Sequence, residues 1–300
     1  MVNKLFAACA YMELCDISLE TIGILTFSTY LFCNNSMKRI CLFLFSGTGI
    51  TKYVVDTLIN EFKKKQIFVD LFIIESTYLE HIEFDTYQML GIAYPVHSFN
   101  APKIVIDFAK KIPMTNKMEA FIISTAGGDS FLNNSSSRLL IQILKNKNFN
   151  VFFDKQYIMP SNFILKDDKT IVQNKIIAVN IEKQMTVDKI VNCISYRQKE
   201  NIVSKLIAII GRLEWVGLRI VQRIFYVNKD CIRCEMCIKN CPKNNIALTE
   251  KSLTFKRKCM LCMRCLYLCP IQCIKAKRVF KFIIFDKWYE NKEFSIIKEK

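Results

Sequence analysis

The stretch ICLFLFSGTGIT, residues 40–51, decides the fold of this 300-residue chain. Its first half, Ile40–Phe45, is a continuous apolar run of the kind that forms a β-strand buried on both faces. A turn rich in glycine and hydroxyl side chains follows at once, and apolar residues such as Val54 and Val55 then recur at helical spacing over Thr51–Lys64. The stretch therefore predicts a strand–loop–helix unit at the start of an open α/β sheet.

The same alternation of strand and helix continues to about residue 160. Pro95 and Pro160 end apolar runs that predict strands, and Pro102 suits the first turn of a helix. Strands that alternate with helices across short loops predict an open α/β unit with a largely parallel sheet. The expected strands are Ile67–Ile74, Met89–Tyr94, Ala120–Ser124 and Val151–Met159, and the expected helices are Ala101–Ile112 and Ser136–Leu144.

Five segments are expected from these patterns. Residues 1–36 form an N-terminal extension, and 37–180 form the α/β domain. From about Asn180 the pattern turns helical, which predicts a helical bridge over 181–226. A small cysteine-rich α+β domain over 227–280 and a tail over 281–300 complete the chain.

The N-terminal extension contains the uncharged, largely apolar run Thr21–Cys33, which is too short to cross a bilayer. Glu13, Asp16 and Glu20 precede it, and their charge has the wrong sign for a signal peptide. Two interpretations remain open. Residues 1–36 are an accessory extension or an upstream artefact of start-site choice, or they form a hairpin or short helix that associates with a membrane surface. No transmembrane segment is expected.

A cysteine repeat is the second decisive feature. Nine of the fourteen cysteines lie in residues 231–273, in short spacings that suit metal ligation better than disulfide pairing. The run Cys231-x2-Cys234-x2-Cys237-x3-Cys241-Pro242 returns as Cys259-x2-Cys262-x2-Cys265-x3-Cys269-Pro270. Each copy is too small to bury a core alone, so the two are expected to fold together around metal.

This spacing is the bacterial ferredoxin run, in which the fourth cysteine of each copy ligates the other [4Fe–4S] cluster. Zinc also uses Cys-x-x-Cys pairs, but it gains nothing from three cysteines at successive spacings followed by x3-Cys-Pro. Cys273 follows a complete set and is expected to be a small buried side chain. The predicted ligands are Cys231, Cys234, Cys237 and Cys269 for cluster 1, and Cys259, Cys262, Cys265 and Cys241 for cluster 2.

The net charge of +16 is concentrated around these cysteines. From Lys229 to Lys281 there are thirteen Lys and Arg residues but only three acids. Cationic neighbours favour the more negative, reduced form of a cluster and attract acidic partners. An acidic redox partner protein is therefore expected, and no nucleic acid, because no nucleic-acid motif accompanies the charge. The basic side chains singled out for this role are Arg233, Lys239, Lys243, Lys258 and Arg264.

The loop after the first strand is a candidate phosphate site. Free N–H groups at the start of the following helix converge there with a favourable dipole. The loop is not a Walker loop, and it lacks the third glycine of the dinucleotide motif. Its candidate phosphate-binding residues are Ser46, Gly47, Thr48, Gly49, Ile50 and Thr51.

With that loop, the chain resembles flavodoxin, whose five-stranded sheet has the order 2-1-3-4-5 with FMN at the switch point. Together with the cysteine repeat, residues 37 to about 278 are similar to the flavodoxin–ferredoxin fusion proteins of anaerobic bacteria. The resemblance rests on the two motif sets in this order and on Ala93–Pro95, Asn100–Pro102, Ser124–Gly128 and Met159–Asn162.

The resemblance implies FMN and two loops that reach its ring. Ile50 departs from the family, which usually has Asn there, and neither Trp215 nor Trp288 lies in a sheet loop where a tryptophan could cover the ring. His97 and Phe99 are then the available ring neighbours. The candidate ring-binding residues are Pro95, Val96, His97, Phe99, Asn100, Thr125, Ala126, Gly127 and Gly128.

These features predict an electron-transfer protein of the cytoplasm that moves single electrons between an external carrier, two [4Fe–4S] clusters and FMN. The alternative is an enzyme that reduces a small substrate at the flavin, with His97 as the proton donor. A third hypothesis is a non-redox binding module with zinc at the cysteines, which the ligand spacing disfavours.

Overall fold

The computed structural model describes residues 39–128, 131–161, 167–213, 215, 225–250, 253–276 and 294. Its larger part is a sheet in the order β2-β1-β3-β4-β5, in which every neighbouring pair is parallel. This is the flavodoxin-like doubly wound order, and it confirms the predicted fold class. The strands are β1 (Arg39–Leu44), β2 (Phe68–Ile73), β3 (Met89–Pro95), β4 (Met118–Ala126) and β5 (Phe149–Ile158).

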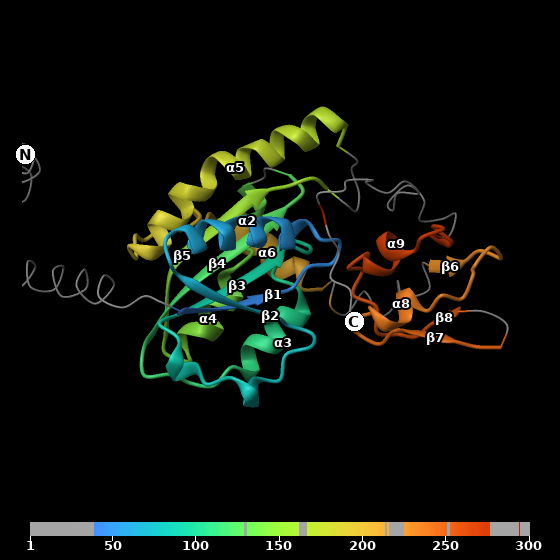
Figure 1. Ribbon diagram of the computed structural model, residues 1–300, viewed down its shortest axis with the longest axis horizontal. Coiled ribbons are helices and arrows are strands. Elements are labelled where there is room, and N and C mark those ends of the chain that lie inside the picture. The colour runs from blue at the N-terminus through green and yellow to red at the C-terminus, as the bar shows by residue number, and fades with distance from the viewer. Residues whose placement is uncertain are drawn as a thin grey trace, which may run out of the picture. The chain divides into compact units, whose positions relative to one another are not determined.

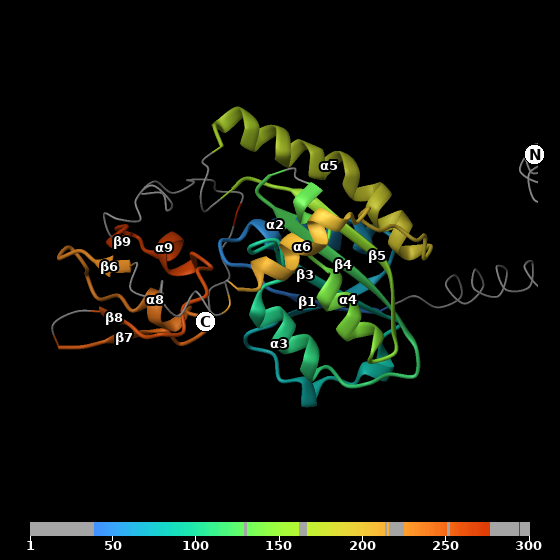
Figure 2. The same ribbon diagram turned by 180° about the vertical axis from the view of Figure 1, so that it is seen from behind.

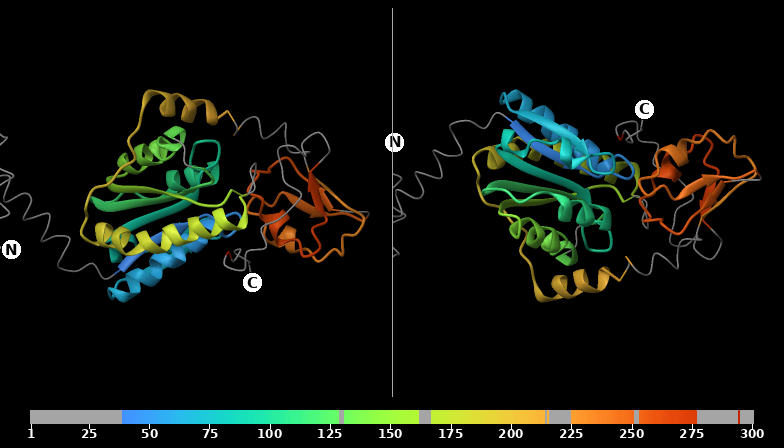
Figure 3. Two further views of the ribbon diagram at one scale, coloured as in Figure 1. Left: turned by 90° about the horizontal axis from the view of Figure 1, so that it is seen from above. Right: turned by 90° about the horizontal axis from the view of Figure 1, so that it is seen from below.

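Helices cover both faces of this sheet (Figure 1, and from behind in Figure 2). The helices α2 (Ile50–Lys64) and α5 (Lys169–Val191) lie on one face, and α3 (Lys103–Lys111), α4 (Arg138–Lys145) and α6 (Ile202–Gly211) lie on the other, as Figure 3 shows. Two apolar clusters follow from this arrangement. One joins Phe43 and Phe45 to α3 and α4, and the other joins Leu42 to α2 and α5. Alternate residues of β1 therefore serve opposite faces.

The expected domain boundary at residue 180 falls inside α5, which is one continuous helix of 23 residues. The Asp168 side chain caps it by accepting a hydrogen bond of 2.8 Å from the backbone N–H of Ile171. Val179, Val187 and Ile190 are buried in the same apolar cluster as α2. The helix therefore belongs to the α/β domain rather than to a bridge.

The small domain is built from the two halves of the cysteine repeat. Its strands pair antiparallel, β6 (Phe225–Val227) with β9 (Ile274–Ala276) and β7 (Ile246–Leu248) with β8 (Leu253–Phe255). Each half supplies one short helix, α8 (Met236–Lys239) or α9 (Arg264–Leu268), which contains the third cysteine of its repeat. One apolar cluster that includes Phe225, Leu253 and Leu266 joins the halves, as the repeat predicts.

No helix in the described part of the chain is long and apolar enough to cross a membrane. The expected N-terminal extension, residues 216–224 of the expected bridge, and the tail apart from Phe294 lie outside the described residues.

Candidate functional site

The candidate phosphate loop joins β1 to α2 at the carboxyl edge of the sheet. Gly49 occupies the N-cap position with φ of 91°, a left-handed conformation that glycine adopts without strain. The Ser46 hydroxyl accepts a hydrogen bond of 3.3 Å from the backbone N–H of Lys52, and the Thr51 hydroxyl shares one of 2.8 Å with Thr125. Ser46, Thr48 and Thr51 are buried. The loop is thus a compact, hydroxyl-lined turn at a helix N-terminus, as predicted.

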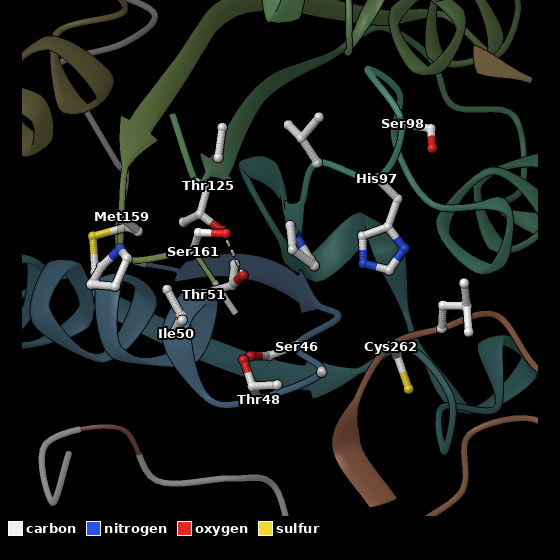
Figure 4. A pocket seen from close by; sticks show the side chains of 17 residues that line it. Ser46, Thr48, Ile50, Thr51, His97, Ser98, Thr125, Met159, Ser161 and Cys262 are labelled. Atoms are coloured by element: carbon white, nitrogen blue, oxygen red, sulfur yellow. Dashed lines mark hydrogen bonds between the residues drawn. The ribbon is translucent and has the colours of Figure 1, made fainter. Parts of the chain in front are cut away.

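A pocket of about 210 Å³ opens beside this loop (Figure 4). Most of the predicted cofactor residues line it, although the lining does not include Gly49, Phe99, Asn100 or Gly128. The predicted residues that do line it are Ser46, Gly47, Thr48, Ile50, Thr51, Pro95, Val96, His97, Thr125, Ala126 and Gly127.

Asn100 has a different position from the one expected. Its side chain is buried, donates to the carbonyl oxygens of Ser98 (3.0 Å) and Ala208 (2.8 Å), and accepts from Arg212 Nε (3.3 Å). These bonds fasten the loop after β3 to α6. Phe99 has φ of 62° in the turn that His97 and Asn100 close with two backbone hydrogen bonds. Phe99 and Asn100 therefore shape the loop, whereas His97 and Ser98 line the pocket.

Six further residues line the pocket that the candidate set omitted: Ser98, Met159, Pro160, Ser161, Leu261 and Cys262. The segment Met159–Ser161 follows β5, and Pro160 was the available signal, since loops at the carboxyl ends of parallel strands meet at one edge. Cys262 was predicted only as a cluster ligand. Its place in this lining brings the second cysteine repeat to the same pocket as the phosphate loop (Figure 4).

Lys175 of α5 ties the loops after β4 and β5 together. Its Nζ donates to the carbonyl oxygens of Gly127 (3.1 Å) and Met159 (3.3 Å) and pairs with Asp167 at 2.6 Å. The Lys175 and Asp167 side chains are only 17% and 14% exposed. Charge-assisted bonds shielded in this way hold more tightly than surface ion pairs.

Replacing Lys175 with methionine is expected to loosen both loops and weaken FMN binding about tenfold, which corresponds to the loss of one charge-assisted hydrogen bond. Fluorescence titration of the flavin-free protein with FMN measures this. Lys183→Met on the same helix is the control, since Lys183 bonds only the exposed Asn180 side chain. Equal affinities for the two variants would contradict the assignment.

His97 points its ring into the pocket (Figure 4). Desolvation by the surrounding protein lowers its pKa to about 4, so the imidazole is neutral near pH 7. Its ring lies edge-on to Phe45, with 6.4 Å between centroids. A neutral imidazole suits contact with a planar ring better than it suits proton donation.

The eight predicted ligand cysteines separate into two hollows in the small domain. One hollow is lined by Cys241, Cys259, Cys262 and Cys265, and the other by Cys231, Cys234, Cys237 and Cys269. Each hollow therefore takes three cysteines from one repeat and the fourth from the other. This grouping is the crossed set that the spacing predicts, and that these eight thiolates are the ligands remains our proposal. Among the described side chains, no three His, Cys, Asp or Glu gather tightly enough for a single metal ion.

Backbone geometry is the same around both hollows. The residues on each side of the middle cysteine have positive φ: Arg233 (53°) and Glu235 (60°), then Leu261 (52°) and Met263 (62°). Alternating backbone conformations of this kind turn N–H groups toward an anion, as at many iron–sulfur sites. Backbone N–H groups also donate to cysteine sulfurs, from Asn245 to Cys241 Sγ at 3.3 Å and from Leu261 to Cys259 Sγ at 3.4 Å.

Burial acts on several of these thiols. Burial raises the pKa of Cys237 and Cys259 to about 11 and that of Cys262 to about 12. Such thiols stay protonated near pH 7 until a metal displaces their protons. Cys273 is buried in the hollow of Cys231, with its Sγ 3.3 Å from Cys269 Sγ.

The residues of the larger pocket fit a flavin phosphate. Three buried hydroxyls and a helix N-terminus supply donors at one end, and Ile50 lies where a polar side chain would add another. At the other end Gly127 has no side chain, and Pro95, Val96 and Met159 offer apolar surface. A pocket with this mixed polar and apolar lining is typical of cofactor sites.

Comparison with known proteins identifies the small domain. Residues 223–270 match a family described as the 4Fe-4S dicluster domain. The cysteine-rich domain is therefore an iron–sulfur domain of the [4Fe–4S] type, as its spacing predicts. No curated protein matches the chain.

Solved structures with weak likeness include three redox proteins. A flavodoxin from Archaea is 13% identical with a TM-score of 0.32, over 51% of this chain and 99% of its own. Flavodoxin 1 from Bacillus cereus is 15% identical with a TM-score of 0.32, over 48% and 97%. An NAD(P)H:quinone oxidoreductase from Methanothermobacter marburgensis is 11% identical with a TM-score of 0.36, over 50% and 96%. Since these TM-scores are below 0.5, we infer neither cofactor nor activity from them.

Proposed function

We propose that this chain is an electron-transfer protein that passes single electrons between an external carrier, two [4Fe–4S] clusters and FMN in the pocket beside the phosphate loop. It would then be a flavodoxin–ferredoxin fusion of the kind known in anaerobic bacteria, working in the reducing cytoplasm that free thiols require. Clusters carry one electron at a time, whereas a flavin takes one or two.

One observation carries the proposal: Cys262 lines both the pocket of the phosphate loop and the hollow of the second cysteine set. Gly47 of the loop lies so close to the Cys262 carbonyl oxygen that no Cβ would fit between them. Both segments belong to one compact unit, Met37–Lys300. Cluster 2 is therefore the one next to the flavin, and cluster 1 is the distal one.

The alternative, reduction of a small substrate at the flavin, has less support. Among the described residues of the pocket, His97 is the candidate proton donor for this reaction, and the lowered pKa of about 4 leaves that imidazole neutral near pH 7. An electron carrier needs no proton from His97.

Rapid-mixing spectroscopy of anaerobically purified protein tests the order of the centres. After reduction by a one-electron donor, we expect cluster absorbance to bleach before the flavin absorbance changes. A variant that lacks cluster 2 should lose fast reduction of the flavin. If flavin reduction stays equally fast in that variant, cluster 2 does not serve the flavin.

An acidic partner would find its surface around the second repeat. Lys256, Arg257 and Lys258 are exposed and consecutive, directly before Cys259. Lys243 is half-buried, and this burial lowers its pKa; of the charged residues of α3, Asp107 raises the pKa, and Lys103 and Lys111 lower it. Lys256, Arg257 and Lys258 are therefore the basic stretch that we propose for docking beside cluster 2. Around Cys231–Cys237, by contrast, Asp230, Glu235 and Glu250 balance the basic residues.

Replacing Lys256, Arg257 and Lys258 with glutamine is expected to lower the association rate with an acidic [2Fe–2S] ferredoxin about tenfold at low salt. The difference should shrink as ionic strength rises. Stopped-flow kinetics measure it. The matched control neutralises Lys63, Lys64 and Lys65 at the far end of α2. If both triple variants slow association equally, only net charge matters and the surface is not specific.

A further inference from the structure

Arg264 is a fully buried charge beside the second cluster set. It lies between Cys262 and Cys265, and its side chain is only 1% exposed. The sequence places it among the basic residues that are expected to surround the clusters, and the structure shows that its side chain is buried. At the same position of the first repeat stands Met236, which carries no charge. The two repeats are therefore electrostatically unequal.

The contacts of Arg264 lead into the α/β domain. Its Nη2 donates to the carbonyl oxygen of Ser46 at 2.7 Å and forms an ion pair with Glu75. The guanidinium carbon lies 5.9 Å from the centre of the Phe45 ring. Within the small domain, Nη1 donates to the carbonyl oxygen of Asn240 at 3.4 Å. Two of these contacts, those to Phe45 and Ser46, reach the segment that leads from β1 into the phosphate loop.

Glu75 depends on this contact. It follows β2 at the carboxyl edge of the sheet, and its side chain is only 3% exposed. Neither carboxylate oxygen has a hydrogen-bond partner in the described part of the chain, so the Arg264 ion pair is the compensation that the structure shows. A buried carboxylate without a cation is strongly unfavourable. Arg264 and Glu75 are thus a matched pair across two domains.

We propose that Arg264 is a positioning residue for cluster 2: it fixes the cluster 2 loop on the phosphate loop and biases cluster 2 toward its reduced state, while Glu75 offsets part of that bias. The inference rests on the proposed function, because it assumes the ligand set Cys241, Cys259, Cys262 and Cys265. A reduced cluster carries one more negative charge, and a fixed cation in a low-dielectric site favours it. Met236 gives cluster 1 no such cation.

We expect replacement of Arg264 and replacement of Glu75 to shift the ratio of reduced to oxidised cluster 2 in opposite directions. A role in packing alone would not produce opposite shifts. Arg264→Gln removes the cation, so the ratio of reduced to oxidised cluster 2 at a fixed potential should fall at least about tenfold, which is 59 mV for one electron. Glu75→Gln removes the offsetting anion, so the same ratio should rise. Redox titration of the anaerobic holoprotein, followed by electron paramagnetic resonance, measures both. Cluster 1 should be unaffected, and Met236→Leu is the matched control.

Shifts of the same sign in the two variants, shifts below about twofold, or an equal shift of cluster 1 would overturn the proposal. If Arg264→Gln fails to retain cluster 2, the redox titrations of Glu75→Gln and Arg264→Lys decide whether the proposal holds. Lysine keeps the charge and should keep the ratio, whereas a loss of the bias with lysine would contradict a charge effect. Iron and FMN contents of the unmodified protein test the proposed function separately. Absence of iron would overturn both, and absence of FMN would overturn only the flavin assignment.

Discussion

Replacing Cys241 with alanine is expected to remove cluster 2 and leave cluster 1 in place. Cys241 belongs to the first repeat by sequence, yet it lines the hollow of Cys259, Cys262 and Cys265. Loss of one of four thiolates opens that site. Iron should fall from about eight to about four atoms per chain, because each cluster holds four. Metal analysis and electron paramagnetic resonance of anaerobic protein measure the change.

Comparison with cysteines that are assigned to the same cluster in the crossed and the uncrossed arrangement shows which cluster is lost. The spectrum of Cys241→Ala should match that of Cys262→Ala and differ from that of Cys234→Ala. Cys269→Ala should show the reverse pattern. Cys273→Ala is the control within the same hollow as Cys269, and it should retain both clusters. If Cys241→Ala matches Cys234→Ala instead, each repeat binds its own cluster and the crossed assignment is wrong.

Replacing Gly47 with alanine should separate the two redox sites. A Cβ at this position would overlap the carbonyl oxygen of Cys262, which is backbone and has no flexible end to move aside. The phosphate loop and the cluster 2 loop must therefore move apart. Because the rate of electron transfer falls as the distance between two redox centres grows, we expect electron transfer between cluster 2 and the flavin to slow several-fold.

Flash or rapid-mixing reduction of the anaerobic protein measures this rate. Gly128→Ala is the matched control, because a Cβ there meets nothing within 4 Å. Both variants should retain their iron. If the Gly47→Ala rate equals that of Gly128→Ala, the close approach of Gly47 to Cys262 has no part in electron transfer.

The sheet and the grouping of the cysteines could be predicted from the sequence, because the signals for both are local. A strand that is buried on both faces consists of an unbroken run of apolar residues. The ends of β1 and β3 therefore lie within one or two residues of their expected positions. The alternation of strands and helices predicts a largely parallel sheet, and the resemblance of the loop after β1 to that of flavodoxin implies the strand order. The repeated spacing of the cysteines likewise predicts which four lie close together, and the same groups line the two hollows.

What could not be predicted depends on partners far apart in the chain. The first half of α5 has buried Val172 and Ile176 beside exposed Ile171 and Ile177, so its inner face does not stand out in the sequence. Asn100 has the polarity of a cofactor ligand, but its side chain donates hydrogen bonds to the carbonyl oxygens of Ser98 and of Ala208 in α6.

Arg264 could not be told from a surface arginine by sequence, because its partners Ser46 and Glu75 lie in the other domain. Burial, and not residue type, distinguishes it from Lys258 and Arg257, which are exposed. Long-range contact between two domains has no periodic signal in a sequence. Only the folded chain shows which basic residues act on a cluster from within the protein.

Analysis of the cofactors in protein purified without oxygen tests the central claim most directly. The account predicts about eight iron atoms and eight acid-labile sulfides per chain, one releasable FMN and a broad visible charge-transfer absorption. Zinc bound in place of iron, with no such absorption, would contradict it.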